Sequence, residues 1–138
     1  KSLPLPLVIG GLKRLELLRT RSELRENLWT IVNALQKGLK ERGFNIGNTQ
    51  SPVTPVYLNG TVGEGGNLIY DIRETHNIFC SVVIYPVVPK GVILVRIIPT
   101  AVHTLDDVEE TIKAFEAIKE KLQNGIYKQE KYVSFALS

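Results

Sequence analysis

The stretch Gly91-Val92-Ile93-Leu94-Val95-Arg96-Ile97-Ile98 decides the fold, because it is β-branched or apolar at nearly every position. Such a run predicts a strand that is buried on both faces. A second β-rich run, 78–85, precedes it, and 53–58 predicts a third strand. Pro55 has no N–H to donate to a ladder, so this third strand is expected at an edge of the sheet.

Helical patterns flank these strands. Four segments carry apolar residues at helical spacing: 6–19, 24–39, 67–76 and 108–122. Thr20 with Glu23 and Thr104 with Asp107 have the spacing of helix-capping pairs, and Gly43 suits a helix C-terminus. Helices with one apolar stripe must bury that stripe, so we predict a two-layer α/β sandwich in which the helices pack on the sheet.

The composition fits one globular domain of 138 residues, with 43% hydrophobic and 22% charged residues. Despite the net charge of +3, Lys and Arg are scattered among acidic residues, which argues against nucleic-acid binding. No run approaches the roughly 18 apolar residues of a membrane span, and the single Cys80 cannot form an internal disulfide. We therefore expect a cytoplasmic protein. The start at Lys1 and the absence of methionine suggest a segment of a longer chain.

Self-contained catalytic chemistry is poorly supported, and we predict no catalytic residue. Cys80 lies inside a predicted strand between His76 and His103, which leaves a Cys-His pair open, but free cysteines in apolar strands are usually inert. Two histidines without a Cys-x-x-Cys or His-x-x-x-His pattern predict no metal site. The glycine-rich segment 61–66 lacks the spacing and lysine of a phosphate loop and is interpreted as a connection.

Two residues near the end of the deciding strand could serve a site. His103 is expected to fix the strand-to-helix corner by hydrogen bonding, with a direct role in a site as the alternative. Arg96 shares a strand face with apolar residues, and its guanidinium needs a partner. That partner is either a helix carboxylate, such as Glu109 or Glu116, or the carboxylate of a small substrate, which the planar fork of arginine suits.

Three spaced motifs carry a resemblance to a known family: Tyr85-Pro86-Val87-Val88-Pro89-Lys90-Gly91, then Val95-Arg96, then Ala101-Val102-His103-Thr104. In this order they resemble the signature that closes the α-oxoamine synthases. The similarity extends upstream through 22–29, 43–44 and 52–56, and it covers nearly the whole chain to about Leu122. It is specific to the family and not to one member. Many members have Arg where this chain has Leu94.

The resemblance implies the C-terminal small domain of a fold-type I homodimer, in which helices pack on a small, mainly antiparallel sheet. In that family pyridoxal phosphate forms a Schiff base with a lysine far upstream, which has no counterpart in this chain. The isolated chain is therefore expected to be inactive. The parent enzyme is expected to condense an amino acid such as glycine or serine with an acyl-CoA.

The resemblance also assigns roles to individual residues. Arg96 aligns with the arginine that receives the amino-acid carboxylate. The stretch that reaches the partner subunit's cofactor phosphate ends near Lys1, which makes Lys1 and Ser2 candidate phosphate contacts. Three further residues are expected to be structural beside the site: Pro86, Pro89 and His103.

A single C-terminal domain, residues 1–138, follows from this interpretation. We expect 1–20 to be a linker or interface helix whose apolar residues drive self-association, 21–123 to be the core, and 124–138 to be a tail of open role. The domain would contribute substrate-carboxylate binding and domain closure. A non-enzymatic α/β binding or dimerisation module is the alternative.

Overall fold

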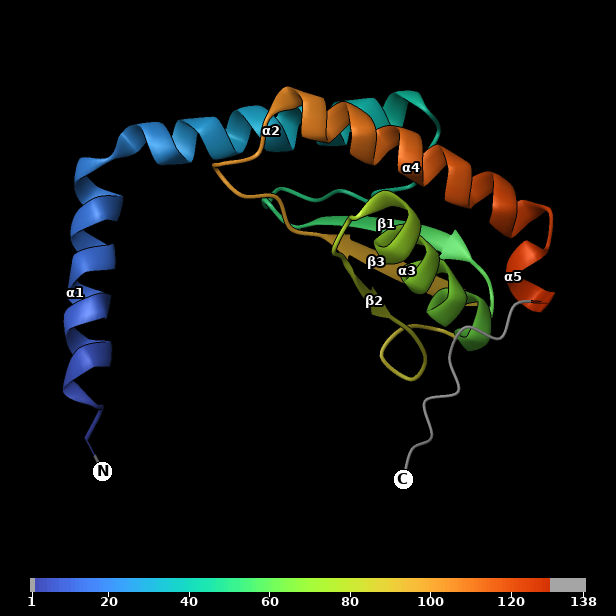
Figure 1. The fold of residues 1–138 in the computed structure, drawn as a ribbon, viewed down its shortest axis with the longest axis horizontal. Coiled ribbons are helices and arrows are strands. Elements are labelled where there is room, and N and C mark those ends of the chain that lie inside the picture. The colour runs from blue at the N-terminus through green and yellow to red at the C-terminus, as the bar shows by residue number, and fades with distance from the viewer. Residues whose placement is uncertain (1, 130–138) are drawn as a thin grey trace.

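The structure is a computed structural model and describes residues 2–129 (Figure 1). Three strands form one antiparallel sheet in the order β1-β3-β2: β1 (Thr54–Asn59), β2 (Ser81–Val83) and β3 (Val92–Ile97). Five helices occur in the described residues: α1 (Leu5–Thr20), α2 (Ser22–Glu41), α3 (Val62–His76), α4 (Leu105–Gln123) and α5 (Ile126–Gln129). The predicted α/β sandwich is confirmed, with the proline-containing β1 at a sheet edge.

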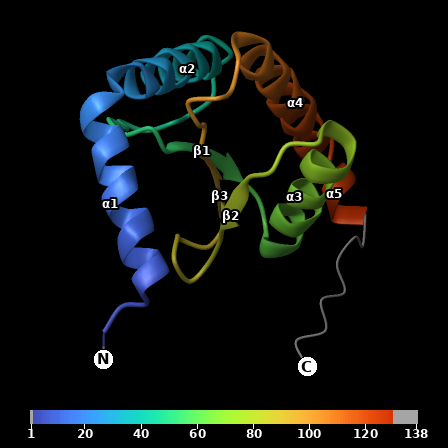
Figure 2. The ribbon, with the colours of Figure 1, turned by 60° about the vertical axis from the view of Figure 1, so that its left-hand side comes forward.

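The helices α2, α3 and α4 arc over one face of the sheet, as Figure 2 shows. Ile93, Val95 and Ile97 of β3 point into the core beneath these helices and are buried. The alternate residues behave differently, since Leu94 is half-buried and Arg96 is exposed. The prediction that this strand is buried on both faces is therefore wrong, because in the described residues the helices cover only one face of the sheet. The other face of the sheet is open.

Helix α2 ends where its sequence suggests, but it does not begin with the predicted N-cap. Thr20 belongs to α1, where its hydroxyl donates to the carbonyl of Glu16 at 2.9 Å. The predicted Thr20–Glu23 capping box is therefore wrong, and Arg21 occupies the N-cap position of α2. At the other end Gly43 adopts φ +70°, and the Phe44 N–H bonds back to the Leu39 carbonyl at 3.0 Å. This is the hydrogen bond of a Schellman motif.

Helix α4 begins with the predicted capping box of Thr104 and Asp107. The Thr104 N–H donates to the carboxylate of Asp107 at 2.7 Å, and the Asp107 N–H donates to the Thr104 hydroxyl at 3.2 Å. These bonds lower the pKa of Asp107, the contact with the Thr104 backbone contributing most. They also fix where α4 leaves the sheet.

Helix α3 begins five residues earlier than predicted, and the glycine-rich segment lies inside it. Thr61 and Glu64 form a reciprocal capping box, with bonds of 2.8 and 3.2 Å. The Thr-x-x-Glu signal was present in the sequence, but the glycines lower helix propensity and obscured it. At the C-terminus of α3, Asn77 adopts a left-handed backbone conformation and caps the helix, and the residues that follow form the connection to β2. The strand predicted over 78–85 is consequently only Ser81–Val83.

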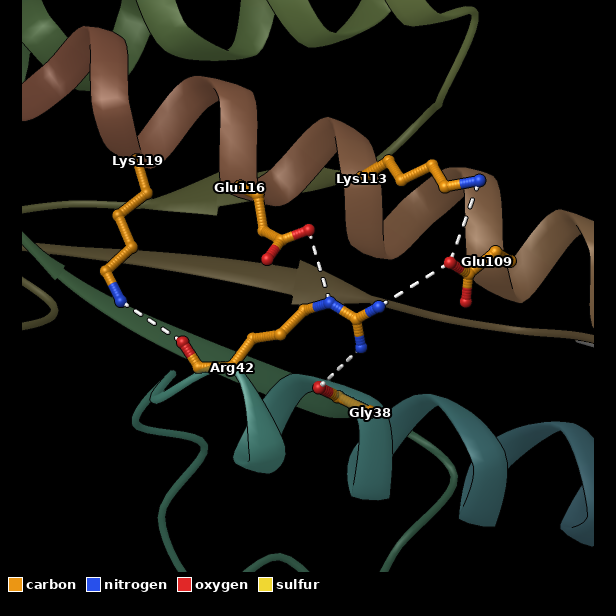
Figure 3. Close-up of polar contacts among 6 residues, drawn as sticks. All are labelled: Gly38, Arg42, Glu109, Lys113, Glu116 and Lys119. Atoms are coloured by element: carbon orange, nitrogen blue, oxygen red, sulfur yellow. Dashed lines mark hydrogen bonds and ion pairs between the residues drawn. The ribbon is translucent and has the colours of Figure 1, made fainter.

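Helices α2 and α4 meet closely along their length. Gly38 leaves the space for this approach, because a Cβ there would lie 2.3 Å from the Cδ1 atom of Ile112. At the end of the contact Arg42 bridges the helices through ion pairs to Glu109 at 3.5 Å and Glu116 at 3.2 Å (Figure 3). Lys119 adds a hydrogen bond to the Arg42 carbonyl at 3.4 Å.

A buried polar cluster fixes the chain after α4, in the segment predicted only as a tail. Tyr127 is 1% exposed, and its hydroxyl donates to the carboxylate of Asp71 at 2.6 Å. The same carboxylate accepts from Lys121 at 2.8 Å and from Thr75 at 2.8 Å. Asn67 donates to the Tyr127 carbonyl at 2.7 Å. Residues 130–138, including the apolar run 132–137, lie outside the described residues.

Burial acts to raise the pKa of Asp71, but hydrogen bonds from Lys121, Tyr127 and Thr75 outweigh it and leave the pKa below its usual value. A carboxylate with a lowered folded-state pKa stabilises the fold above its unfolded pKa and loses that effect as pH falls through the folded value. The stability advantage of wild type over Asp71→Asn should therefore be largest at neutral pH. It should shrink below about pH 4, the ordinary aspartate pKa. Urea unfolding at pH 3 to 7 measures this, and a constant difference would contradict it.

Tyr127→Phe tests the same cluster from the other side. We expect the free energy of unfolding to fall by about 1.5–3 kcal/mol, the range for a hydrogen bond to a charged group. Tyr57→Phe is the matched control, because Tyr57 is 39% exposed on the open face, and its substitution should change stability by less than about 0.5 kcal/mol. Equal losses in the two variants would contradict the role of the Tyr127 hydroxyl.

Helix α1 stands apart from the rest of the domain in both views (Figures 1 and 2). It contains no buried residue, and its large apolar side chains are exposed, Leu12 by 63% and Leu18 by 69%. The stretch 5–12 carries no charge and is apolar around the helix, a pattern typical of helices that are surrounded. None of the helices in residues 2–129 is long and apolar enough to cross a bilayer.

We expect two copies of the chain to associate through α1, because this surface is otherwise exposed to water. Sedimentation velocity should show a concentration-dependent dimer. Leu12→Glu with Leu15→Glu should weaken it by more than about tenfold, because each buried leucine contributes ~1.5–3 kcal/mol. Val87→Glu, at another highly exposed apolar position, is the control. A monomer at high concentration in which residues 3–18 are protected from hydrogen exchange would refute the expectation.

Candidate substrate site on the open sheet face

Arg96 lies on the open face at the centre of the sheet. Its strand β3 is the middle one, and the register places Arg96 opposite Pro55 on β1 and opposite Ser81 on β2. The side chain is exposed, and its Nε donates to the Ser81 hydroxyl at 3.1 Å. Because a strand in the middle of a sheet is held from both sides, the Cα of Arg96 is fixed while its guanidinium reaches outward.

No carboxylate of residues 2–129 forms an ion pair with Arg96. The two partners considered from the sequence, Glu109 and Glu116, instead pair with Arg42 across α2 and α4. Pairing of Arg96 with a helix carboxylate is therefore wrong, because those helices cover the opposite face of the sheet. The terminal nitrogens of Arg96 have no hydrogen-bond partner within the described part of the chain.

Among the strand residues that the register places beside Arg96 on this face, no other is charged. The register places seven further side chains on it: Pro55, Tyr57, Asn59, Ser81, Val83, Val92 and Leu94. One guanidinium among neutral and mostly apolar groups is a site for one anionic group, and a planar carboxylate matches its fork. With Leu94 beside it on β3, Arg96 is the single cation among the strand residues of this face.

The connection between β2 and β3 borders the open face. Pro86 and Pro89 are both exposed in it, and the chain turns through bonds from Val87 N–H to the Ile84 carbonyl and from Val92 N–H to the Pro89 carbonyl. The ammonium of Lys90 lies 5.1 Å from the centre of the Tyr85 ring, a cation–π contact within one loop. The expected structural role of the two prolines beside the site stays a prediction.

His103 lies at the corner between β3 and α4. Its Nδ1 accepts the backbone N–H of Thr100 at 2.8 Å and lies 3.1 Å from the Thr100 hydroxyl. The hydrogen bonding expected at this corner is thus present, and in the neutral ring it places the proton on Nε2. His103 and His76 also line one pocket of about 510 Å³ beside Ile98. A direct role of His103 in a site stays a prediction.

The remaining candidates are Cys80, a metal site and the first two residues. Cys80 is buried, and desolvation raises its pKa to about 11, so it is a protonated thiol at neutral pH. No group of three or more His, Cys, Asp or Glu residues suited to a metal ion occurs in residues 2–129. Ser2 is exposed ahead of α1, and Lys1 lies outside the described residues, so their phosphate contacts stay a prediction.

The chain's lysines do not resemble a cofactor lysine. Eight lie in the described part, and none of them is buried. Most are engaged at the surface, as Lys121 is with Asp71 and Lys13 is with Glu16. The expectation that the Schiff-base lysine lies upstream of this chain stays a prediction.

Sequence comparison gives clear relatives, although no family model matches the chain. It is 56% identical over 128 residues to the cysteate-C-fatty acyltransferase of Capnocytophaga ochracea, covering 93% of this chain and 30% of that protein. It is 33% identical over 122 residues to the 8-amino-7-oxononanoate synthase of Exiguobacterium sibiricum, covering 87% of this chain and 30% of that protein. The chain thus spans less than a third of the length of these relatives.

Structure comparison agrees. A serine palmitoyltransferase of S. paucimobilis, solved with a pyridoxal-phosphate adduct of myriocin, matches with a TM-score of 0.76 and 25% identity, over 89% of this chain and 31% of that one. The 8-amino-7-oxononanoate synthase of Francisella tularensis shares the fold, with a TM-score of 0.72 and 18% identity, over 91% of this chain and 35% of that one.

The described residues form a small α/β domain with one exposed guanidinium on an open sheet face. Its relatives by sequence and by structure are acyltransferases and oxoamine synthases of one kind. The resemblance found in the sequence is confirmed: over this domain-length segment the chain is similar to the pyridoxal-phosphate-dependent α-oxoamine synthases.

Because no described lysine is buried, the chain of residues 1–138 should not form a specific adduct with pyridoxal phosphate. After borohydride reduction, mass spectrometry should find sparse labelling spread over exposed lysines such as Lys40 and Lys128. Stoichiometric labelling of one lysine would contradict the expectation.

Proposed function

We propose that this chain is the C-terminal domain of a pyridoxal-phosphate-dependent enzyme that joins the acyl group of an acyl-CoA to the α-carbon of an amino acid. The family resemblance and the match to about 30% of each curated relative support this. Free coenzyme A is the second product, and carbon dioxide is released where the reaction is decarboxylative. Pyridoxal phosphate, when bound in the parent enzyme, supplies the electron sink for the carbanion at the α-carbon.

The observation that carries the proposal is the exposed guanidinium of Arg96, which forms no ion pair within residues 2–129. Within residues 2–129 its terminal nitrogens have no partner, so they can donate to both oxygens of a carboxylate, and the middle strand β3 fixes the Cα from which the side chain extends. A carboxylate held in this way orients the α-carbon of the amino acid relative to the rest of the parent enzyme. Orientation of this kind lowers the entropic part of the barrier.

The open face also supports a role in closure. Tyr57 and Ile98 are exposed near Arg96, by 39% and 58%, and Tyr85 of the adjoining connection by 51%. Apolar side chains gathered around one charge indicate a surface that another part of the parent protein covers. Covering it would remove water from the carboxylate contact and strengthen that contact electrostatically.

The amino acid is glycine, serine or a close analogue, and the 56% identical relative makes cysteate the first substrate to test, with a fatty acyl-CoA as the acyl donor. Cysteate has a carboxylate and a sulfonate, whereas the open face offers only one guanidinium. The sulfonate would therefore contact residues outside this domain. Comparing kcat/KM of the full-length parent for cysteate, serine and glycine, each with the same acyl-CoA, distinguishes the candidates.

A non-enzymatic binding or dimerisation module remains the second candidate, and the exposed apolar surface of α1 is the observation that favours it. Absence of acyl transfer in the full-length parent with all three amino acids would favour this alternative. Association through α1 would then be the activity of the chain.

Arg96→Lys in the full-length parent should raise the KM of the amino acid while retaining the charge. The loss of the planar fork should weaken amino-acid recognition by about 1.5–3 kcal/mol, the range for a hydrogen bond to a charged group. The melting temperature should hardly change, because Arg96 is exposed and forms no ion pair in the described residues.

Arg42→Lys is the matched control. Arg42 joins α2 to α4 through Glu109 and Glu116, so its substitution should lower the melting temperature and leave the KM of the amino acid unchanged. If Arg96→Lys lowers stability and leaves amino-acid affinity intact, Arg96 does not belong to the site.

A further inference from the structure

Ser81 is the polar side chain beside Arg96. The two residues are directly opposite in the antiparallel pair of β2 and β3, where side chains on one face are neighbours. The Nε–H of Arg96 donates to the Ser81 hydroxyl at 3.1 Å. On the other side Arg96 faces Pro55, whose side chain has no polar atom. Within the described residues, Ser81 thus makes the only hydrogen bond to this guanidinium.

This bond decides which edge of the guanidinium is available. A carboxylate can bind an arginine side-on, through Nε and one terminal nitrogen, or end-on, through both terminal nitrogens. Because the Nε–H points at Ser81, the side edge is occupied. The end edge remains open toward the uncovered face of the sheet.

The bond also limits the freedom of a long side chain. Arg96 is exposed, and an exposed arginine samples many rotamers that it must give up on binding. A hydrogen bond at Nε restricts the last torsions before the terminal nitrogens. Part of the ordering is then complete before the ligand arrives, which favours binding.

We propose that Ser81 is a positioning residue that holds Arg96 for end-on recognition of the amino-acid carboxylate. This inference rests on the proposed function and deepens it, because it assigns the binding geometry to a residue outside the motifs that resemble the family. Ser81 acts through Arg96.

The experiment uses the full-length parent and four variants, one of which is the Arg96→Lys variant described above. Ser81→Ala should raise the KM of the amino acid by about three- to tenfold, the equivalent of one net hydrogen bond, and leave the KM of the acyl-CoA and the melting temperature unchanged. Ser81→Thr retains an oxygen acceptor and should restore most of the affinity. Val83→Ala, two residues along the same edge strand and on the same face, controls for packing.

Equilibrium binding of L-serine or L-cysteate, measured by calorimetry without acyl-CoA, should show the same ranking. If Ser81→Ala and Ser81→Thr weaken affinity equally, or if Val83→Ala reproduces the effect, the positioning role is refuted. If Arg96→Lys leaves amino-acid affinity intact, the proposed function itself fails. If only Arg96→Lys has an effect, the function stands and Ser81 has no part in it.

Discussion

The alternation of side chains along β3 is the constraint on which the domain depends. Ile93, Val95 and Ile97 all point under the helices and are buried, while Val92, Leu94 and Arg96 point the other way. A shift of one residue in the register would place the arginine in the core and an isoleucine outside. The apolar core therefore fixes the face on which the guanidinium is exposed, so the stability of the fold and the proposed recognition depend on the same strand.

Around this strand, the other contacts keep the helices on one side. Gly38 lets α2 and α4 approach closely, and Arg42 at the end of α2 forms ion pairs with two glutamates of α4. The reciprocal bonds of Thr104 and Asp107, together with the His103 contact to Thr100, set the corner from which α4 departs. Glu109, Glu116 and Asp107 are engaged in these contacts on the helical side, and no carboxylate of residues 2–129 pairs with Arg96.

The sequence predicted the strands, the edge position of β1 and the stripe of α4, because each depends on local periodicity or on one proline. It did not predict that β3 has an open face, since a run of β-branched residues looks the same whether one or both faces are covered. Ser81 as the neighbour of Arg96 was missed for a related reason: cross-strand register depends on pairing, which no local pattern encodes. Asp71 and Tyr127 are 56 residues apart, and only tertiary structure brings them together.

The cluster around Tyr127 also defines where the domain can be cut. The residue lies beyond the end of α4, in a segment without a clear sequence period, yet its ring is part of the hydrophobic core. A shortened gene that stops at the end of α4 would remove this ring from the core. It would also remove the hydroxyl that donates to Asp71, whose carboxylate is largely buried. Boundaries for domain exchange between relatives should accordingly be drawn after α5, even though the helical pattern in the sequence ends before it.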